Sequence, residues 1–496
     1  MNKVKITVSP AHTVGQTDER IYGSFIEHIG RAVYGGIYEP EHPTSDEYGF
    51  RGDVAGLIKE LNVPLIRYPG GNFVSGYNWE DGIGPKDKRP RRVDLAWKAT
   101  DTNQCGTDDF SAYCDRIGAA PLMTVNLGTA GINEAKNIVE YCNLPGGTDY
   151  SERRRANGFE KPHAIKTWCL GNEMDGVWQI GHKEAYEYGR LAAEASKAMK
   201  WVDPSIKTVI CGSSAPDLPT FPKWEETVLD CAYDHVDYIS LHRYYNNNNK
   251  DTLSFVASPV DAEAYINTVI SVCDYMKARK RSPKTMMLSF DEWNVWKHTC
   301  DLPREPWAVA PPILEEYYST EDALVVGGIL ITLLRHCDRV KIACLAQLVN
   351  VIAPIMTENG GGAWKQTIFY PFSDASNNGR GLVYDIRTES PVYHCSYGEV
   401  PYVDAAIVKN EDGRTVIFAV NRSLDEEADL ECNLSQVAGD AFLAVHTTLT
   451  SDSPYDHNSM NEPNKVAPHL CEAPKNEKGT LLCKLPPFSW NMITVQ

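Results

Sequence analysis

Eight short hydrophobic runs recur between residues 21 and 347 of the chain. Each is almost continuously apolar or β-branched, which is typical of parallel strands covered on both faces. The runs occupy residues 21–25, 63–68, 121–126, 165–170, 207–211, 236–242, 285–290 and 340–347. Between them the apolar positions recur at helical spacing, most regularly in 185–202, 262–280 and 321–336. This alternation predicts an α/β fold, a (β/α)8 TIM barrel.

Beyond residue 375 the pattern changes to short β segments separated by turns. Residues 405–420 read as a hairpin with Asp412-Gly413 at its turn, and 442–449 and 492–495 also read as strands. We therefore expect a C-terminal all-β sandwich, jelly-roll-like, over residues 376–496 and the catalytic barrel over 16–375. Residues 1–15 contain an alternating strand, which we expect to join the sandwich.

Composition and charge narrow the class of partner. Of 496 residues, 66 are acidic and 48 basic, a net charge of −18, which argues against nucleic acid or an anionic membrane as the main partner. The sequence has neither an apolar run of about 20 residues nor an N-terminal signal pattern, so a cytoplasmic location is expected. Fourteen scattered cysteines, many in apolar runs, are expected to be free thiols in a reducing compartment.

Polar side chains follow nearly every predicted barrel strand, at the ends that open onto the active site in this fold. They are Glu27, His28, Arg67, Asn72, Asn126, Asn172, Glu173, His242, Tyr244, Tyr245, Asp291, Glu292, Gln347 and Asn350. Glu173 follows the fourth strand and Glu292 the seventh, so the two carboxylates face each other across the mouth. A facing carboxylate pair is the machinery of glycoside hydrolysis. Aromatic rings that could stack on a sugar lie close by in sequence: Trp178, Trp293, Trp296, Tyr244 and Tyr245.

Each of these residues also has a plain structural interpretation. Asp291 and Glu292 could equally form a helix N-cap with its first-turn acid. Arg67 could belong to a structural ion pair, His242 could be a buried core histidine, and the tryptophans could be core residues. The eightfold arrangement favours a site over any single residue. No phosphate-binding loop, HExxH, GxGxxG after the first strand, or GxSxG is present.

Longer sequence motifs occur in order along nearly the whole chain. They are IYGSFIEHIGRAVYGGIY (21–38), RYPGGNFVSGYNWEDGIGP (67–85), AWKATDTNQCGTDDF (96–110), WCLGNEMDG (168–176), ISLHRYY (239–245), DEWNVW (291–296), LAQLVNVIAPI (345–355) and LPPFSWNMITV (485–495). Together they resemble glycoside hydrolase family 51, the retaining α-L-arabinofuranosidases of clan A. The resemblance implies an exo-acting enzyme that releases terminal α-L-arabinofuranosyl units from arabino-oligosaccharides, derived from arabinan or arabinoxylan.

The resemblance also implies roles for individual residues. Glu173 would be the general acid/base and Glu292 the nucleophile, with Arg67 holding the nucleophile's carboxylate. The substrate-binding residues would be Glu27, Asn72, Asn172, Tyr244 and Gln347, to which we add His242, Trp178 and Trp296 from the strand-end pattern and the nearby aromatic residues. No metal or cofactor is expected, and family members are often hexamers, so a homo-oligomer is expected.

Retention makes a geometric prediction. The two carboxyl groups should lie about 5–5.5 Å apart, whereas about 6.5–9.5 Å would indicate inversion. Three alternatives stay open from the sequence: a β-xylosidase or β-1,4-glucanase of the same clan, a metal-dependent sugar isomerase or lyase using Asp291, Glu292 and His242, and a sugar-binding protein without catalysis.

Overall fold

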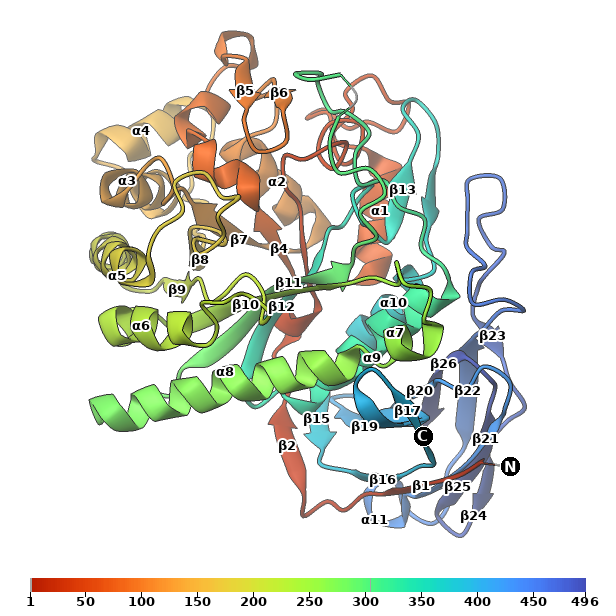
Figure 1. The fold of residues 1–496 in the computed structure, drawn as a ribbon. Helices are drawn as coiled ribbons and strands as arrows, with labels where there is room; N and C mark the ends of the chain where they lie inside the picture. Colours follow the sequence, from red (N-terminus) through yellow and green to blue (C-terminus); the bar gives the residue numbers. More distant parts are fainter. Residues whose placement is uncertain (1, 304) are drawn as a thin grey trace.

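A closed barrel of eight parallel strands forms the centre of the computed structural model, which describes residues 2–303 and 305–496. Around the barrel the strands follow the order β10-β11-β12-β3-β4-β7-β8-β9. Figure 1 shows the barrel and its helices to the left of the β-rich C-terminal part of the chain. Their bounds are β3 Gly23–Phe25, β4 Leu65–Tyr68, β7 Ala120–Val125, β8 Thr167–Leu170, β9 Lys207–Ile210, β10 Tyr238–Tyr245, β11 Met287–Val295 and β12 Val340–Ala346. Each overlaps one of the eight predicted runs, and the predicted fold class is confirmed.

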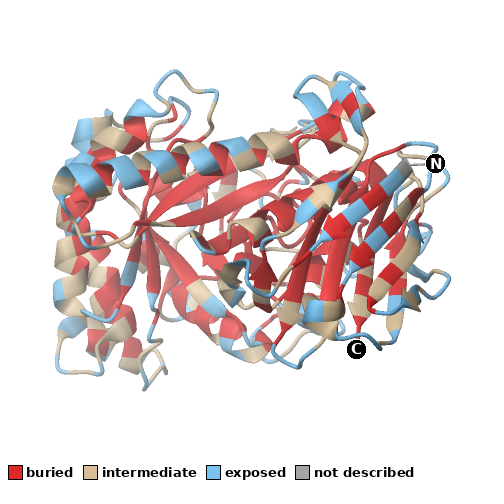
Figure 2. Cartoon of the chain, turned by 90° about the horizontal axis from the view of Figure 1, so that it is seen from below, coloured by how far each residue is buried: buried red, intermediate tan, exposed pale blue. Residues whose placement is uncertain are grey.

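Helices cover the outside of the barrel and present an apolar stripe to it. They are α1 Gly52–Leu61, α2 Thr107–Ile117, α3 Ile132–Asn143, α4 Asp149–Ala156, α5 Ala185–Val202, α6 Lys223–Ala232, α7 Thr252–Val256, α8 Pro259–Lys280, α9 Thr320–Arg335 and α10 Phe369–Asn378. In α5 the residues Tyr188, Ala192, Ala195 and Met199 are buried, as their spacing predicts. Figure 2 shows the barrel strands coloured as buried, while the surrounding helices also show exposed and intermediate positions.

The sandwich consists of a five-stranded and a seven-stranded sheet. The first has the order β16-β1-β21-β25-β24 and the second β2-β15-β19-β20-β26-β22-β23. Their strands are β1 Asn2–Thr7, β2 Thr13–Gln16, β15 Gly381–Tyr384, β16 Arg387–Glu389, β19 Val403–Asn410, β20 Thr415–Asn421, β21 Ala428–Asn433, β22 Ala444–Leu449, β23 His469–Leu470, β24 Lys475–Glu477, β25 Thr480–Leu485 and β26 Ser489–Val495. The short helix α11, Ser435–Ala438, follows β21. The expected hairpin with its turn at Asp412-Gly413 is present as β19 and β20.

The N-terminal segment supplies one strand to each sheet of the sandwich. Strand β1 pairs in parallel with β21 and antiparallel with β16, and β2 pairs with β15. Val4, Ile6 and Val8 lie in the sandwich core. The domain boundaries drawn before residue 16 and after residue 375 stay a prediction, and residue 1 lies outside the described residues.

Three small hairpins complete the described part of the chain. They are β5 Arg92–Asp94 with β6 Ala99–Asp101, β13 Ile355–Thr357 with β14 Ala363–Lys365, and β17 Val392–Cys395 with β18 Gly398–Pro401. Single 3-10 turns lie at η1 Glu19–Tyr22, η2 Asn72–Gly76, η3 Trp79–Gly82 and η4 Lys86–Lys88. Turn η2 directly follows β4 and the turn at residues 69–71, so it lies at the rim where the candidate residues gather.

Helix α9 joins the two domains. All its residues from 320 to 334 are buried, because it contacts α8 and α10 of the barrel domain as well as strands β19, β20 and β26 of the sandwich. Arg335 at its end forms an ion pair with Asp404 of β19. Within the described residues no helix is long and apolar enough to cross a membrane, and all fourteen cysteines are free.

Candidate active site

A bulge in strand β11 brings two adjacent acidic residues to the mouth of the barrel. Ser240 of β10 pairs with Ser289, but the next registered pair is His242 with Glu292, so β11 contains one extra residue there. The register of β11 against β12 shifts over the same stretch. Side chains normally alternate between the two faces of a strand, and a bulge re-aims them. Asp291 and Glu292 therefore both reach the interior, and the interpretation of Asp291 as a helix N-cap is wrong because β11 continues to Val295.

A tight turn after strand β8 carries the second acid. Gly171 has φ +85°, and Glu173 itself has φ +46°, a left-handed conformation that is uncommon outside glycine. Glu173 is thereby directed back over the barrel, where its Oε1 lies 3.0 Å from Nδ1 of His242. The backbone at Glu173 is held in a conformation of higher energy, a feature that concentrates at functional sites.

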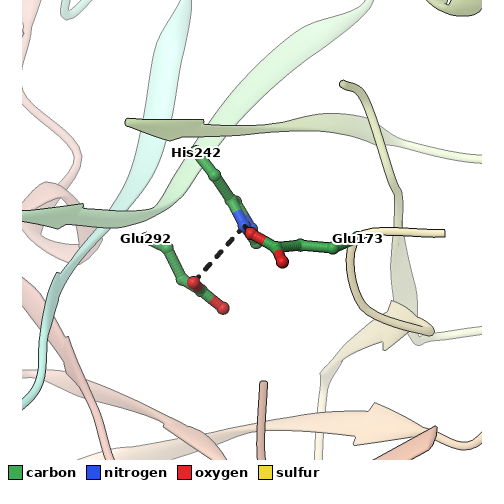
Figure 3. Close-up of side chains that lie close together, drawn as sticks. All are labelled: Glu173, His242 and Glu292. Carbon is green, nitrogen blue, oxygen red and sulfur yellow. Dashed lines mark hydrogen bonds and ion pairs between the residues drawn. The ribbon is translucent and has the colours of Figure 1, made fainter. Parts of the chain in front are cut away.

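The two glutamates come close to each other on either side of His242 (Figure 3). One carboxylate oxygen of Glu173, one of Glu292 and a ring nitrogen of His242 all lie within 4.8 Å of one another. Nδ1 of His242 is 3.4 Å from Oε2 of Glu292. An oxygen of Glu173 thus lies no more than 4.8 Å from an oxygen of Glu292, and this closeness favours the arrangement for direct nucleophilic attack, with carboxyl groups about 5–5.5 Å apart, over the wider one that leaves room for a water.

Glu292 is held through both of its oxygens. Nη1 of Arg67 donates to Oε1 at 2.5 Å, and the hydroxyl of Tyr244 donates to Oε2 at 3.0 Å. Arg67 is 1% exposed and its Nη2 donates to Oδ1 of Asn172 at 2.7 Å. The side-chain amide of Asn172 in turn donates to Oδ1 of Asn72 at 3.2 Å. Four of the residues predicted from strand ends thus form one connected network around Glu292.

Glu27, which follows β3, and Gln347, which follows β12, bind each other at the same rim. The backbone N–H of Glu27 donates to Oε1 of Gln347 at 2.9 Å, and Nε2 of Gln347 lies 3.3 Å from Oε2 of Glu27. Oε1 of Glu27 accepts from the backbone of Phe73 and from Nε1 of Trp97, each at 2.8 Å. A Cβ at Gly71 would lie 2.1 Å from Oε2 of Glu27, so only glycine leaves room for this carboxylate.

The aromatic residues divide into two groups. Nε1 of Trp178, which is 49% exposed, donates to Oε2 of Glu173 at 2.8 Å. Trp296 packs edge-on against Tyr244 with ring centroids 5.3 Å apart. Trp293 and Tyr245 are instead buried in the core, so the structural interpretation holds for both.

Three polar strand-end residues make contacts of a different kind. His28 binds Asp101 and Tyr68, and Asn126 binds residues of the neighbouring loops. Asn350 bonds to the backbone of Arg31 and to Thr357. These contacts hold the loops at the rim and give the residues a structural role.

Burial and neighbouring charges set the protonation of the site. Burial raises the pKa of Glu173, the nearby Glu292 adds to this, and the hydrogen bonds from His242 and Trp178 oppose it. Burial also raises the pKa of Glu27 to about 8, against the hydrogen bonds from Phe73 and Trp97. Glu173 is therefore favoured in its acid form.

His242 carries a positive charge in this setting. Burial alone would lower its pKa, but the carboxylates of Glu292, Asp291 and Glu173 raise the pKa of His242 to about 10. Glu173, His242 and Glu292 are also the one group of possible metal ligands found among the described residues. An imidazolium has protons on both nitrogens and no lone pair for a metal ion. A metal ion would have to displace a proton from this ring, and the set of Asp291, Glu292 and His242 that the isomerase alternative requires is not such a group among the described residues.

Two contributors were not among the residues predicted to bind substrate. Trp97 lies in the loop between β5 and β6, away from any barrel strand, so the strand-end rule could not find it; its presence in the 96–110 motif was the only signal. Asp291 is one of the predicted strand-end residues, but the sequence suggests for it no more than a helix cap or a metal ligand; it is 1% exposed and contacts Ser240, His242 and Arg67.

A (β/α)8 barrel with two close carboxylates at its mouth, surrounded by side-chain amides and aromatic rings, is the arrangement of a glycoside hydrolase. Comparison with known families agrees. The family model described as the α-L-arabinofuranosidase 1 domain matches residues 57–259, and the one described as the α-L-arabinofuranosidase C-terminal domain matches residues 291–489.

Individual relatives match over the whole chain. The chain is 54% identical to intracellular exo-α-(1→5)-L-arabinofuranosidase 1 of Bacillus subtilis, over 100% of this chain and 99% of that protein. It is 47% identical to an exo-α-(1→6)-L-arabinofuranosidase of Bifidobacterium longum, over 100% and 98%. A solved family 51 α-L-arabinofuranosidase from Bifidobacterium longum superimposes with a TM-score of 0.96 at 43% identity, covering 100% of both chains. The chain belongs to glycoside hydrolase family 51, the α-L-arabinofuranosidases.

Proposed function

We propose that this protein is an exo-acting α-L-arabinofuranosidase that works by double displacement with retention of configuration. The observation that carries the proposal is the pair formed by Glu173 and Glu292, with one oxygen of each within 4.8 Å of the other and of His242. The family membership and the relatives named as exo-α-L-arabinofuranosidases support the substrate.

In the first step Glu292 attacks the anomeric carbon of a terminal arabinofuranosyl unit. Glu173 donates its proton to the departing glycosidic oxygen, and a covalent glycosyl-enzyme forms. In the second step Glu173, now a carboxylate, takes a proton from a water that attacks the same carbon and releases arabinose. The raised pKa of Glu173 suits the first role, and the contacts of Arg67 and Tyr244 fix the attacking oxygens of Glu292.

The remaining side chains would bind the sugar. Glu27, Asn72, Asn172, Tyr244 and Gln347 present carboxylate, amide and hydroxyl groups around the same space, and these are the groups that pair with furanose hydroxyls. We assign Trp178 and Trp296 to the aromatic walls and His242 to the cationic centre between the acids.

The setting of the reaction follows from the relatives. Several are named intracellular and act on (1→5) linkages, whereas another is named for (1→6) linkages. We propose that this enzyme acts inside the cell on short arabino-oligosaccharides, and that it forms a homo-oligomer, a hexamer, which light scattering of the purified protein tests directly.

An initial-rate panel tests the function. Wild type, Glu292→Ala and Glu173→Ala are assayed on aryl α-L-arabinofuranoside, β-D-xyloside and β-D-glucoside, with Glu225→Gln as a control at a buried glutamate that only accepts from Ser213. We expect the arabinofuranoside to be hydrolysed fastest and Glu292→Ala to lose almost all activity. Proton NMR of the first-formed arabinose should show the α anomer.

The acid/base assignment has its own test. Glu173→Ala should lose much less activity on aryl arabinofuranosides than on arabino-oligosaccharides, because a good leaving group needs little protonation. Equal losses on both substrates would refute that role. A larger rate on the xyloside or glucoside would transfer the same mechanism to the other specificity, and formation of the β anomer first would exclude retention.

A further inference from the structure

We propose that Asp291 is a positioning residue, which holds the imidazolium of His242 between the two glutamates and holds the guanidinium of Arg67 against Glu292. This inference rests on the proposed function, because it assigns to Asp291 an effect on the acids that carry out the reaction. Asp291 would act on the two glutamates through His242 and Arg67, which it contacts.

The contacts of Asp291 come from three other strands of the barrel. Oδ1 accepts from the hydroxyl of Ser240 on β10 at 2.5 Å and lies 3.4 Å from Nε2 of His242. Oδ2 accepts from the thiol of Cys169 on β8 at 3.3 Å and lies 3.8 Å from Nε of Arg67 on β4. Asp291 is 1% exposed, so contacts with solvent cannot replace these interactions. A carboxylate here ties together β4, β8 and β10.

The imidazole of His242 is held from both sides. Its Nδ1 faces Glu173 at 3.0 Å and Glu292 at 3.4 Å, while Nε2 faces Asp291. With Asp291 and Glu292 ionised, each ring nitrogen faces a carboxylate, which favours a proton on both and so an imidazolium of fixed orientation. Asp175, in the loop after β8, adds a further negative charge nearby. Without Asp291 the Nε2 side would lose the acceptor that fixes the ring.

Arg67 depends on Asp291 in a similar way. Its two Nη atoms bind Glu292 and Asn172, but Nε has no hydrogen-bond partner among the described residues. Asp291 is the carboxylate that faces this atom. Hydrogen bonds to Glu292 and Asn172 and the ring of Phe25 orient the guanidinium, and the charge of Asp291 attracts its Nε side.

Charge balance gives the same answer. With Glu173 as the acid, the anions within 4 Å of the two buried cations, Arg67 and His242, are Asp291 and Glu292, and Asp175 makes no ion pair with either cation among the described residues. The other groups that face Asp291 are the thiols of Cys169, Cys211 and Cys344, which burial keeps neutral by raising their pKa values. An uncharged residue at position 291 would leave less negative charge beside two buried cations, and His242 is the cation that can release a proton.

Asp291→Asn tests this inference, since it keeps the shape and removes the charge. We expect kcat to fall by about 100-fold with KM within about threefold, because misplaced catalytic groups of this kind cost that much. The matched control is Asp404→Asn, in which a carboxylate that faces Arg335 and Arg422 is lost far from the site. It should lower the thermal midpoint while kcat stays within about twofold.

A spectroscopic readout separates positioning from simple loss of structure. With 13C at the Cε1 atoms of histidine and the signal of His242 assigned by its absence in His242→Gln, wild type should show no titration of His242 between pH 5 and about pH 9. Asp291→Asn should show one within that range, and Asp404→Asn should not. This titration needs no substrate, so it can be read even if the panel of glycosides shows no activity and the proposed function fails.

Two results would overturn the inference: kcat of Asp291→Asn within about threefold of wild type, or a His242 that stays protonated to about pH 9 in that variant. Should Asp291→Asn not fold, Ser240→Ala removes the hydroxyl that orients Oδ1 while the charge remains. It should then lower kcat by roughly 3- to 10-fold. An unchanged kcat in Ser240→Ala would likewise count against Asp291.

Discussion

Arg67→Met provides the most direct test of the electrostatics at the centre of the barrel. The change keeps an unbranched side chain of similar length and removes the cation that faces Glu292 and Asp291. Both carboxylates are nearly inaccessible to solvent, so neither can replace the guanidinium with water. We expect the variant to lose almost all activity, because Glu292 would lose the donor that holds its Oε1 and Asp291 would lose the cation that lowers its pKa.

The magnitude follows from the structure. Burial raises the pKa of Asp291, but the charge of Arg67 and then the contacts of His242 lower it. The result is a pKa of about 2, against an ordinary value of 3.8. At roughly 1.4 kcal/mol per pKa unit this corresponds to about 2.5 kcal/mol of stability. Removing one partner of a buried ion pair costs about 3–5 kcal/mol, and the two figures agree in order of magnitude.

The pH dependence has a definite sign. In wild type the contribution of Asp291 is complete above its unfolded pKa near pH 4 and is lost only as pH falls toward 2. In Arg67→Met burial would raise the folded pKa of Asp291 above its unfolded value. The variant would then be relieved at low pH, when the carboxyl takes up a proton, and the difference from wild type should widen from pH 5 to pH 8.

Urea unfolding followed by tryptophan fluorescence at these two pH values measures the difference. The control is Arg154→Met, which removes an equally buried arginine whose hydrogen bonds go to backbone carbonyls of residues 141, 144, 145 and 159. It should lose stability by a similar amount at both pH values. A difference for Arg67→Met that is constant between pH 5 and pH 8 would refute the reasoning.

Three further outcomes are expected. Gly71→Ala should raise KM at least tenfold, because its Cβ meets the carboxylate of Glu27, whereas Gly118→Ala, with φ +78° and open space around it, should leave KM unchanged; equal KM values would contradict this view of Glu27. Trp178→Phe removes a hydrogen bond that lowers the pKa of Glu173, so the alkaline limb of kcat/KM should move to higher pH, and a shift to lower pH would be inconsistent with Glu173 as the acid. Dialysis against a chelator should leave the rate unchanged, and a rate restored only by a divalent ion would reinstate the metal-dependent alternative.

Much of this architecture could be predicted because it depends on local pattern. Strands covered on both faces must be apolar throughout, and the helices between them need one apolar stripe, so the eight strands and helices α5, α8 and α9 could be found by periodicity. Parallel strands in a barrel all end on one rim, so the sequence alone predicts Glu173 and Glu292 at the same rim.

Other features depended on contacts between distant segments. The strand pattern of residues 285–290 ended before the acidic pair, whereas β11 continues to Val295 because its bulge is stabilised by pairing with both β10 and β12. Trp97 reaches Glu27 from a hairpin that no strand-end rule covers. Trp178 and Trp293 both lie close in sequence to one of the two glutamates. Trp293 is nevertheless buried in the core, whereas Trp178 donates to Glu173.

The alternation of strands and helices, the change to a β-rich module and the residue types at the rim could all be predicted from the sequence. These depend on short-range periodicity and on chain chemistry, which are present in the order of residues. The tertiary structure alone decided which rim residues touch. Three features depend on these contacts: the charge on His242, the hydrogen bond from Arg67 to Glu292 and the position of Asp291. Some of the groups involved are more than a hundred residues apart in the chain. They meet in one buried interior, where a few ångströms determine the energy of each charge.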